Sequence, residues 1–209
     1  LMRDVLLTLI LIVLVPMAFR WPWVGTMVWT WVSLMYPQRL TFGFAHDMPI
    51  AAIVGGATLL GFVLVPADRR LPRGAIPVAL VLFILWMCVT SIFAIYPSEI
   101  GEMFMKVMKI QTMTFVTMAL LHERRQVDTF VWVIALSLGF YGVKGGLFTL
   151  RGGGMGSVEG PPGSFIAPNN ELGLALTMVV PLMYYLFSIS SRRSTGAVAW
   201  SPCRCERRG

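Results

Sequence analysis

The sequence predicts an all-α integral membrane protein, a polytopic helical bundle of about seven transmembrane segments. Of the 209 residues, 56% are hydrophobic and only 13% are charged, and the mean hydropathy is +0.74. An average soluble domain carries about a quarter charged residues. Apolar runs recur along the chain, separated by short basic or Pro-containing turns. No polar stretch is long enough for a separate water-soluble core, so a single membrane domain over residues 1–191 is the simplest organisation.

The length of each apolar run can be compared with the roughly 20 helical residues that cross a bilayer core about 30 Å thick. The runs at 5–19 and 24–36 are short, and they predict either a tight helical hairpin or a re-entrant element. The runs at 48–67 and 74–98 carry no charge and are long enough, so they are the clearest spans. The remaining predicted segments cover residues 103–121, 129–150 and 172–191.

Two stretches differ from this pattern. Residues 151–170 contain too many Gly and Pro residues for a regular helix, so we expect a loop between the sixth and seventh segments. Residues 192–209 are basic and change character abruptly, and we interpret them as a disordered tail or as the result of truncation. We therefore expect the bundle to be incomplete and the chain to be a fragment.

The distribution of Lys and Arg predicts the orientation in the membrane. If the first two runs are separate spans, two groups of basic residues fall on opposite sides. Arg20, Arg69, Arg70, Arg73, Arg124, Arg125, Arg192 and Arg193 oppose Arg3, Arg39, Lys106, Lys109, Lys144 and Arg151. The larger group marks the cytoplasmic side, which places the Gly-rich loop outside the cytoplasm. A re-entrant first hairpin would move only the N-terminus.

Several function classes find no support. The net charge of +7 is spread over the ends of apolar runs, which does not predict a nucleic-acid-binding surface. Three cysteines and two histidines predict neither a disulfide framework nor a metal site. The chain contains no phosphate-binding glycine loop and no Ser-His catalytic motif, so we expect no metal and no other cofactor.

Polar residues in and beside the Gly-rich loop are the first candidate site. Arg151 begins the loop, and Asn169, Asn170 and Glu171 end it. Polar groups near a bilayer are candidates for contact with substrate. The alternative is structural: one asparagine would cap the seventh helix, and Glu171 would favour the positive end of its dipole.

Three lysines inside apolar runs form the second candidate set. Lys144 lies among glycines that permit close helix approach, and it either holds a phosphate of a lipid-linked substrate or extends to the interface. Lys106 and Lys109 are three residues apart and share a helix face. They either bind anionic headgroups or a pyrophosphate, or extend to water from the end of a span.

Specific stretches of the chain carry a family likeness. They are residues 29–40, 106–110, 132–150 and 160–167, followed by Asn169-Asn170, and the most specific is 137–148. The chain resembles the bacterial O-glycosylation ligases associated with the exosortase A system, in the O-antigen ligase and polymerase superfamily. The likeness covers roughly residues 2–190, the N-terminal half in that family. The family pattern has an acidic residue where this chain has Pro168, which weakens a carboxylate role there.

The resemblance implies an activity. The parent protein, in the bacterial inner membrane, would transfer oligosaccharide from an undecaprenyl diphosphate carrier to a glycan or protein acceptor on the extracytoplasmic side. The family's Arg and His residues lie in a later loop, so the catalytic residues are unknown here and we expect this chain to be inactive alone. Two alternatives stay open: a transporter or lipid-handling membrane protein, and a non-catalytic structural subunit.

Overall fold

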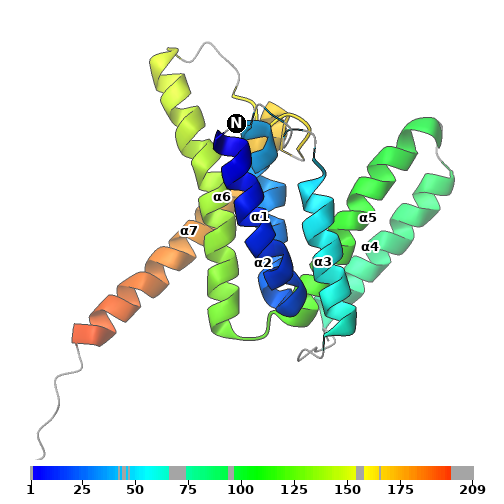
Figure 1. The fold of residues 1–209 in the computed structure, drawn as a ribbon, viewed down its shortest axis with the longest axis horizontal. Coiled ribbons are helices and arrows are strands. Elements are labelled where there is room, and N and C mark those ends of the chain that lie inside the picture. The colour runs from blue at the N-terminus through cyan, green and yellow to red at the C-terminus, as the bar shows by residue number, and fades with distance from the viewer. Residues whose placement is uncertain are drawn as a thin grey trace, which may run out of the picture. The chain divides into compact units, whose positions relative to one another are not determined.

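A computed structural model describes residues 2–41, 43, 46, 48–65, 74–93, 97–153, 158–164 and 166–198 (Figure 1). These residues form α-helices and one 3₁₀-helix, and none of them is in a strand. The elements are α1 (Met2–Arg20), α2 (Pro22–Met35), η1 (Pro37–Leu40), α3 (Ile50–Leu64), α4 (Ala75–Ile92), α5 (Pro97–Leu120), α6 (Arg124–Arg151) and α7 (Asn169–Val198). The prediction of a helical protein is confirmed.

Each predicted apolar run overlaps one of these α-helices over most of its length, but not every helix is long and apolar enough to cross a membrane. Four are long and apolar enough: α1, α4, α6 and the part of α7 over Asn169–Ser190. The run at 48–67, predicted as one of the clearest spans, forms only the 15-residue helix α3, because the backbone turns extended at Val65. In contrast, α1 reaches 19 residues, longer than its predicted run. The count of seven spans therefore stays a prediction.

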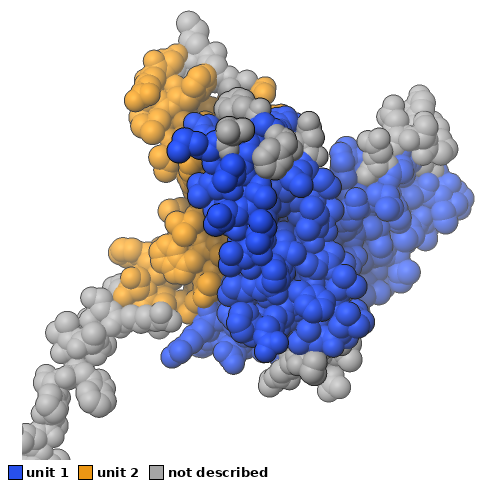
Figure 2. Space-filling view, viewed as in Figure 1, with its two compact units in different colours: residues 1–127 blue, residues 128–209 orange. Residues whose placement is uncertain are grey.

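The chain divides into two compact units, residues 1–127 and 128–209, which Figure 2 colours separately. In unit 1, α1, α2 and α3 pack against one another, and α5 contacts α2, α3 and α4. The first two helices form a hairpin, because Pro22 begins α2 directly after Trp21 and Pro at the first helical position is pre-organised for a helix. Buried side chains at the centre of this bundle come from three helices: Leu7, Val28, Val32, Ile50 and Val54.

Glycines allow the three helices of this bundle to approach closely. A Cβ atom at Gly61 would lie against the carbonyl oxygen of Phe19, with the Phe19 Cα 3.1 Å away. A Cβ atom at Gly25 would lie against the Thr58 hydroxyl and 2.9 Å from its methyl group. Small residues have this role in membrane helix pairs, where association depends on tight packing rather than on the hydrophobic effect.

Two threonine hydroxyls buried in the bundle are satisfied within their own helices, whereas the buried Ser33 hydroxyl has no partner among the described residues. Thr30 Oγ1 donates to the Thr26 carbonyl at 2.8 Å, and Thr58 Oγ1 donates to the Val54 carbonyl at 2.7 Å. Both threonines are buried. Because these hydroxyls need no partner from another helix, polar residues can occupy an interior where an unsatisfied polar group would be costly.

In unit 2, α6 and α7 run in opposite directions past each other. Tyr185 donates a hydrogen bond from its hydroxyl to Asp128 Oδ1 at 3.0 Å, near the start of α6. Further along α6, a Cβ atom at Gly142 would lie 3.1 Å from the Leu176 side chain. The seventh helix also continues to Val198, into the stretch 192–209 that was interpreted as a disordered tail or as the result of truncation. Residues 199–209 lie outside the described part of the chain.

We expect Gly61→Ala to destabilise the protein by about 1–3 kcal/mol, because the added methyl group forces α3 away from the Phe19 carbonyl. Gly56→Ala in the same helix is the control, since nothing lies within 4 Å of a Cβ atom there. Alanine is the better helix former, so the control should be neutral or slightly stabilising. The midpoint of thermal unfolding in detergent micelles measures both variants. Equal midpoints would contradict the proposed close contact.

Candidate functional site

Five of the predicted site residues lie in unit 2, at the end of α6 and the beginning of α7. Lys144 and Arg151 are both exposed on α6. They are seven residues apart, so they lie on nearly the same side of the helix, about 10 Å from each other along its axis. Arg151 is the last residue of α6, where a cation favours the negative end of the helix dipole.

The second half of the Gly-rich stretch is a closed turn without regular helix, as the sequence predicted. The Gly160 N–H donates to the Ala167 carbonyl at 3.0 Å. Inside this closure, Ser164 donates to the Pro161 carbonyl from both its N–H at 3.1 Å and its hydroxyl at 2.7 Å. A Cβ atom at Gly160 would collide with the Ile166 carbonyl, so the closure requires glycine there.

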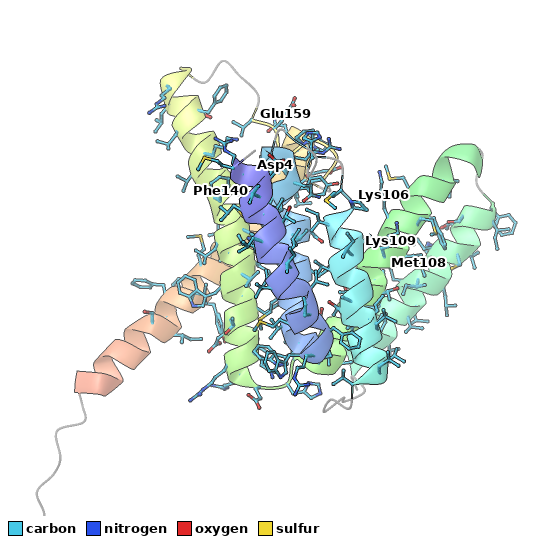
Figure 3. The ribbon with its side chains drawn as sticks, viewed as in Figure 1. Asp4, Lys106, Met108, Lys109, Phe140 and Glu159 are labelled. Atoms are coloured by element: carbon cyan, nitrogen blue, oxygen red, sulfur yellow. The ribbon has the colours of Figure 1, made fainter. Side chains whose placement is uncertain are left out.

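One apolar contact fixes the segment that leads into this turn on α6, and two residues of the turn itself are buried. Pro161 and Ile166 are buried. Val158 packs on α6 at Gly145, where a Cβ atom would lie 2.6 Å from the valine side chain. Glu159, the next residue, is exposed and is labelled in Figure 3. A glycine directly after Lys144 thus brings the chain that leads to α7 back onto the helix that carries the lysine.

The start of α7 differs from the capping interpretation. The helix begins at Asn169, and the Leu172 N–H donates to the Pro168 carbonyl at 3.0 Å. Pro168 therefore occupies the N-cap position and neither asparagine does. Asn169, Asn170 and Glu171 are all exposed in the first turn, which leaves their amide and carboxylate groups available to a ligand. Glu171 has the predicted favourable place in the helix dipole.

The other two predicted site residues, Lys106 and Lys109, are exposed side chains of α5 in unit 1 (Figure 3). Each unit therefore has its own set of exposed cations. The prediction that Lys106 and Lys109 share a helix face is consistent with their position inside the continuous helix α5.

A polar cluster in unit 1 was not recognised in the sequence. Asp4 is buried in the first turn of α1, and its Oδ1 accepts a hydrogen bond from the Gly43 N–H at 3.0 Å. The Arg39 guanidinium lies 3.2 and 3.4 Å from the two ring nitrogens of His46. Gln38 is also buried. The available signal was Asp4 itself, a carboxylate at the start of an apolar run, because a buried charge of this kind needs a nearby donor.

We expect Gly145→Val to displace Val158 and to open the turn at 160–167, because the added side chain occupies the place of the valine. Hydrogen–deuterium exchange of the amides of Gly160 and Ser164, which are bonded within the turn, should become faster by at least about tenfold. Gly146→Val is the matched control, since no atom lies within 4 Å of a Cβ atom there. The same acceleration in both variants would show that Gly145 does not position the turn.

Comparison with known proteins gives one family match. A family model described as a family of unknown function, DUF5935, matches residues 2–190. No curated protein and no solved structure matches the chain. The matched residues include α1 to α6 and most of α7, with the turn at 160–167 and all the candidate site residues. The chain therefore belongs to DUF5935, a family of unknown function.

Proposed function

We propose that this protein is the N-terminal membrane part of a bacterial glycan ligase of the inner membrane. The ligase transfers oligosaccharide from an undecaprenyl diphosphate carrier to a glycan or protein acceptor on the extracytoplasmic side. The observation that carries the proposal is the pair of exposed cations, Lys144 and Arg151, on the helix that Val158 contacts just before the turn at 160–167. The likeness of residues 137–148 and 160–167 to the exosortase-associated ligases supports it.

The chemistry of a diphosphate carrier suits these residues. Negative charge develops on the diphosphate as the sugar leaves, and positioned cations stabilise that charge. Lys144 lies two turns below the end of α6, and its aliphatic stem lets the ammonium group reach the level of a lipid headgroup. The exposed amides of Asn169 and Asn170 can donate hydrogen bonds to sugar hydroxyls. Because the carrier is already an activated donor, the scheme uses no metal and no nucleotide.

The membrane arrangement in this proposal has seven spans. Successive helices then cross in alternate directions. The end of α6 at Arg151 and the start of α7 at Asn169 therefore lie outside the cytoplasm. Under this arrangement α2 and α3, with 14 and 15 residues, cross only where the bilayer is locally thin or where protein surrounds them. Catalysis by Arg and His residues of a later periplasmic loop is part of the same proposal, and this chain contributes the contacts to the donor.

We expect Lys144→Gln with Arg151→Gln to weaken the binding of undecaprenyl diphosphate by about tenfold or more, since two charge-assisted contacts are lost. Binding is measured by native mass spectrometry of the protein released from nanodiscs. Arg124→Gln, which removes an exposed arginine from the opposite end of α6, is the control and should bind as the wild type does. Unchanged affinity in the double variant would refute the role of both cations.

A transport or lipid-handling function is the second candidate. It is favoured by the irregular backbone that ends at Pro168 directly before α7, since interrupted helices often surround substrate sites in transporters. A flux assay in liposomes separates the two functions. Movement of a lipid-linked glycan across the bilayer would favour transport, whereas binding without movement would favour the ligase.

A further inference from the structure

The segment from the last turn of α2 through η1 departs from ordinary packing at three points. Ser33 and Gln38 are only 7% and 3% exposed. Neither the Ser33 Oγ nor the Gln38 Oε1 has a hydrogen-bond partner among the described residues. Tyr36, which lies between them in the chain, has a φ of 48° and is left-handed, alone among the described residues that are not glycine. All three departures therefore concern one place in the fold.

Each departure costs the folded protein stability. A buried oxygen without a donor forfeits the hydrogen bonds that it makes with water in the unfolded chain. A left-handed backbone is unfavourable for a residue with a Cβ atom, and helices that end this way usually have glycine there. The other buried Ser and Thr hydroxyls of the described residues all have a partner: Thr26, Thr30, Thr41, Thr58 and Ser137. Departures that gather at one place are typical of a functional site.

Ionisable side chains lie beside these unpaired oxygens. Arg39 follows Gln38 in η1, and η1 contacts α1. The first turn of α1 holds the buried Asp4, which Figure 3 labels. Its Oδ1 accepts the Gly43 N–H at 3.0 Å, so the chain that follows η1 returns to the start of α1. A carboxylate, an amide and a guanidinium thus meet at one end of unit 1.

The Arg39 guanidinium lies against the face of the His46 ring. Its Nη1 is 3.2 Å from Nδ1 and 3.4 Å from Nε2 of the imidazole. An atom almost equally distant from both ring nitrogens must lie over the ring, because within the ring plane it would collide with another ring atom. Arginine stacks on aromatic faces in this way. The contact holds the guanidinium in place, and a guanidinium has five N–H donors, more than one ring can use.

The chemistry of these groups defines what they can bind. The Gln38 Oε1 and the Asp4 carboxylate accept hydrogen bonds, so a ligand must offer donors. A phosphate offers few donors and is repelled by the carboxylate. The Arg39 guanidinium only donates, so the same ligand must also offer acceptors. Hydroxyl groups do both, and a sugar carries several of them side by side. The half-buried ring of Tyr36 adds an apolar surface beside these polar groups.

We propose that the end of unit 1 formed by Tyr36, Gln38 and Arg39 is a binding site for a neutral sugar. The Gln38 Oε1 and the Arg39 guanidinium bind neighbouring hydroxyls, one as acceptor and the other as donor. The Gln38 oxygen is enclosed in this structure, and rotation of the side chain brings it to the sugar without giving up a hydrogen bond. This inference goes beyond the proposed function, because it involves no diphosphate and neither Lys144 nor Arg151.

The decisive variant is Gln38→Met, which removes the oxygen at nearly constant shape. Because this oxygen has no partner in the fold, the midpoint of thermal unfolding in detergent should stay the same or rise. Sugar binding should weaken about tenfold or more. Saturation-transfer NMR of the full chain in nanodiscs measures it, with glucose, galactose and N-acetylglucosamine as probes. Ser137→Ala, at a buried serine whose hydroxyl is bonded, is the control and should bind as the wild type does.

Two outcomes of this experiment overturn the proposal. A clearly lower unfolding midpoint of Gln38→Met would show that the oxygen has a structural partner. The absence of binding of all three sugars to the wild type would show that the site takes another ligand. Displacement of a bound sugar by inorganic phosphate would likewise indicate an anion site and contradict the assignment to a neutral sugar.

Photocrosslinking locates the site independently. Diazirine derivatives of the same three sugars should label residues 33–46, and the unmodified sugar should compete with this labelling. Labelling confined to other parts of the chain overturns the proposal. Lys144→Gln with Arg151→Gln should leave the labelling unchanged, whatever its effect on undecaprenyl diphosphate. Loss of labelling in that variant would assign the sugar to unit 2 and overturn the inference, whereas the proposed function would stand.

Discussion

The contact between α3 and the α1–α2 hairpin depends on glycine, because Gly61 meets the Phe19 carbonyl and Gly25 meets Thr58. A bilayer offers little hydrophobic force between helices, so close packing and satisfied hydroxyl groups hold such a bundle together. The rest of unit 1 is arranged around this contact. The hairpin brings Asp4 to the Gly43 N–H, and α2 and α3 together provide the surface on which α5 packs.

In unit 2, glycines of α6 again allow other parts of the chain to approach a helix closely. Gly142 allows α7 to approach α6, and Gly145 allows an irregular segment to lie on α6 through Val158. A turn that closes between Gly160 and Ala167 gains order without a regular ladder of backbone bonds, since Ser164 satisfies the Pro161 carbonyl twice. A Gly-rich stretch can therefore be a positioned element. Such order reduces the entropy that a ligand would otherwise have to remove from the loop.

The sequence predicted the helices well and their ends less well. Hydropathy located the seven described α-helices but not the 3₁₀-helix η1, because each apolar run is a local property of the chain. It could not predict that α3 stops at Leu64, since Val65 and Pro66 continue an apolar run that tolerates either conformation. One alternative from the sequence was that Asn169 or Asn170 caps the seventh helix, whereas Pro168 occupies the N-cap position. Asp4 is buried where it contacts Gly43, which lies 39 residues further along the chain. A local sequence pattern does not reveal such a contact.

The lysines inside apolar runs share one residue type but differ in their position in the fold. Lys144 lies two turns from the end of a 28-residue helix about 42 Å long, so its charge reaches water from almost any orientation. Lys109 is the thirteenth of the 24 residues of α5, and its side chain is exposed. From sequence alone both had the same two interpretations, extension to the interface or contact with an anion. Lys144 differs from Lys109 in its surroundings, because the next residue, Gly145, packs against Val158 ahead of the turn at 160–167.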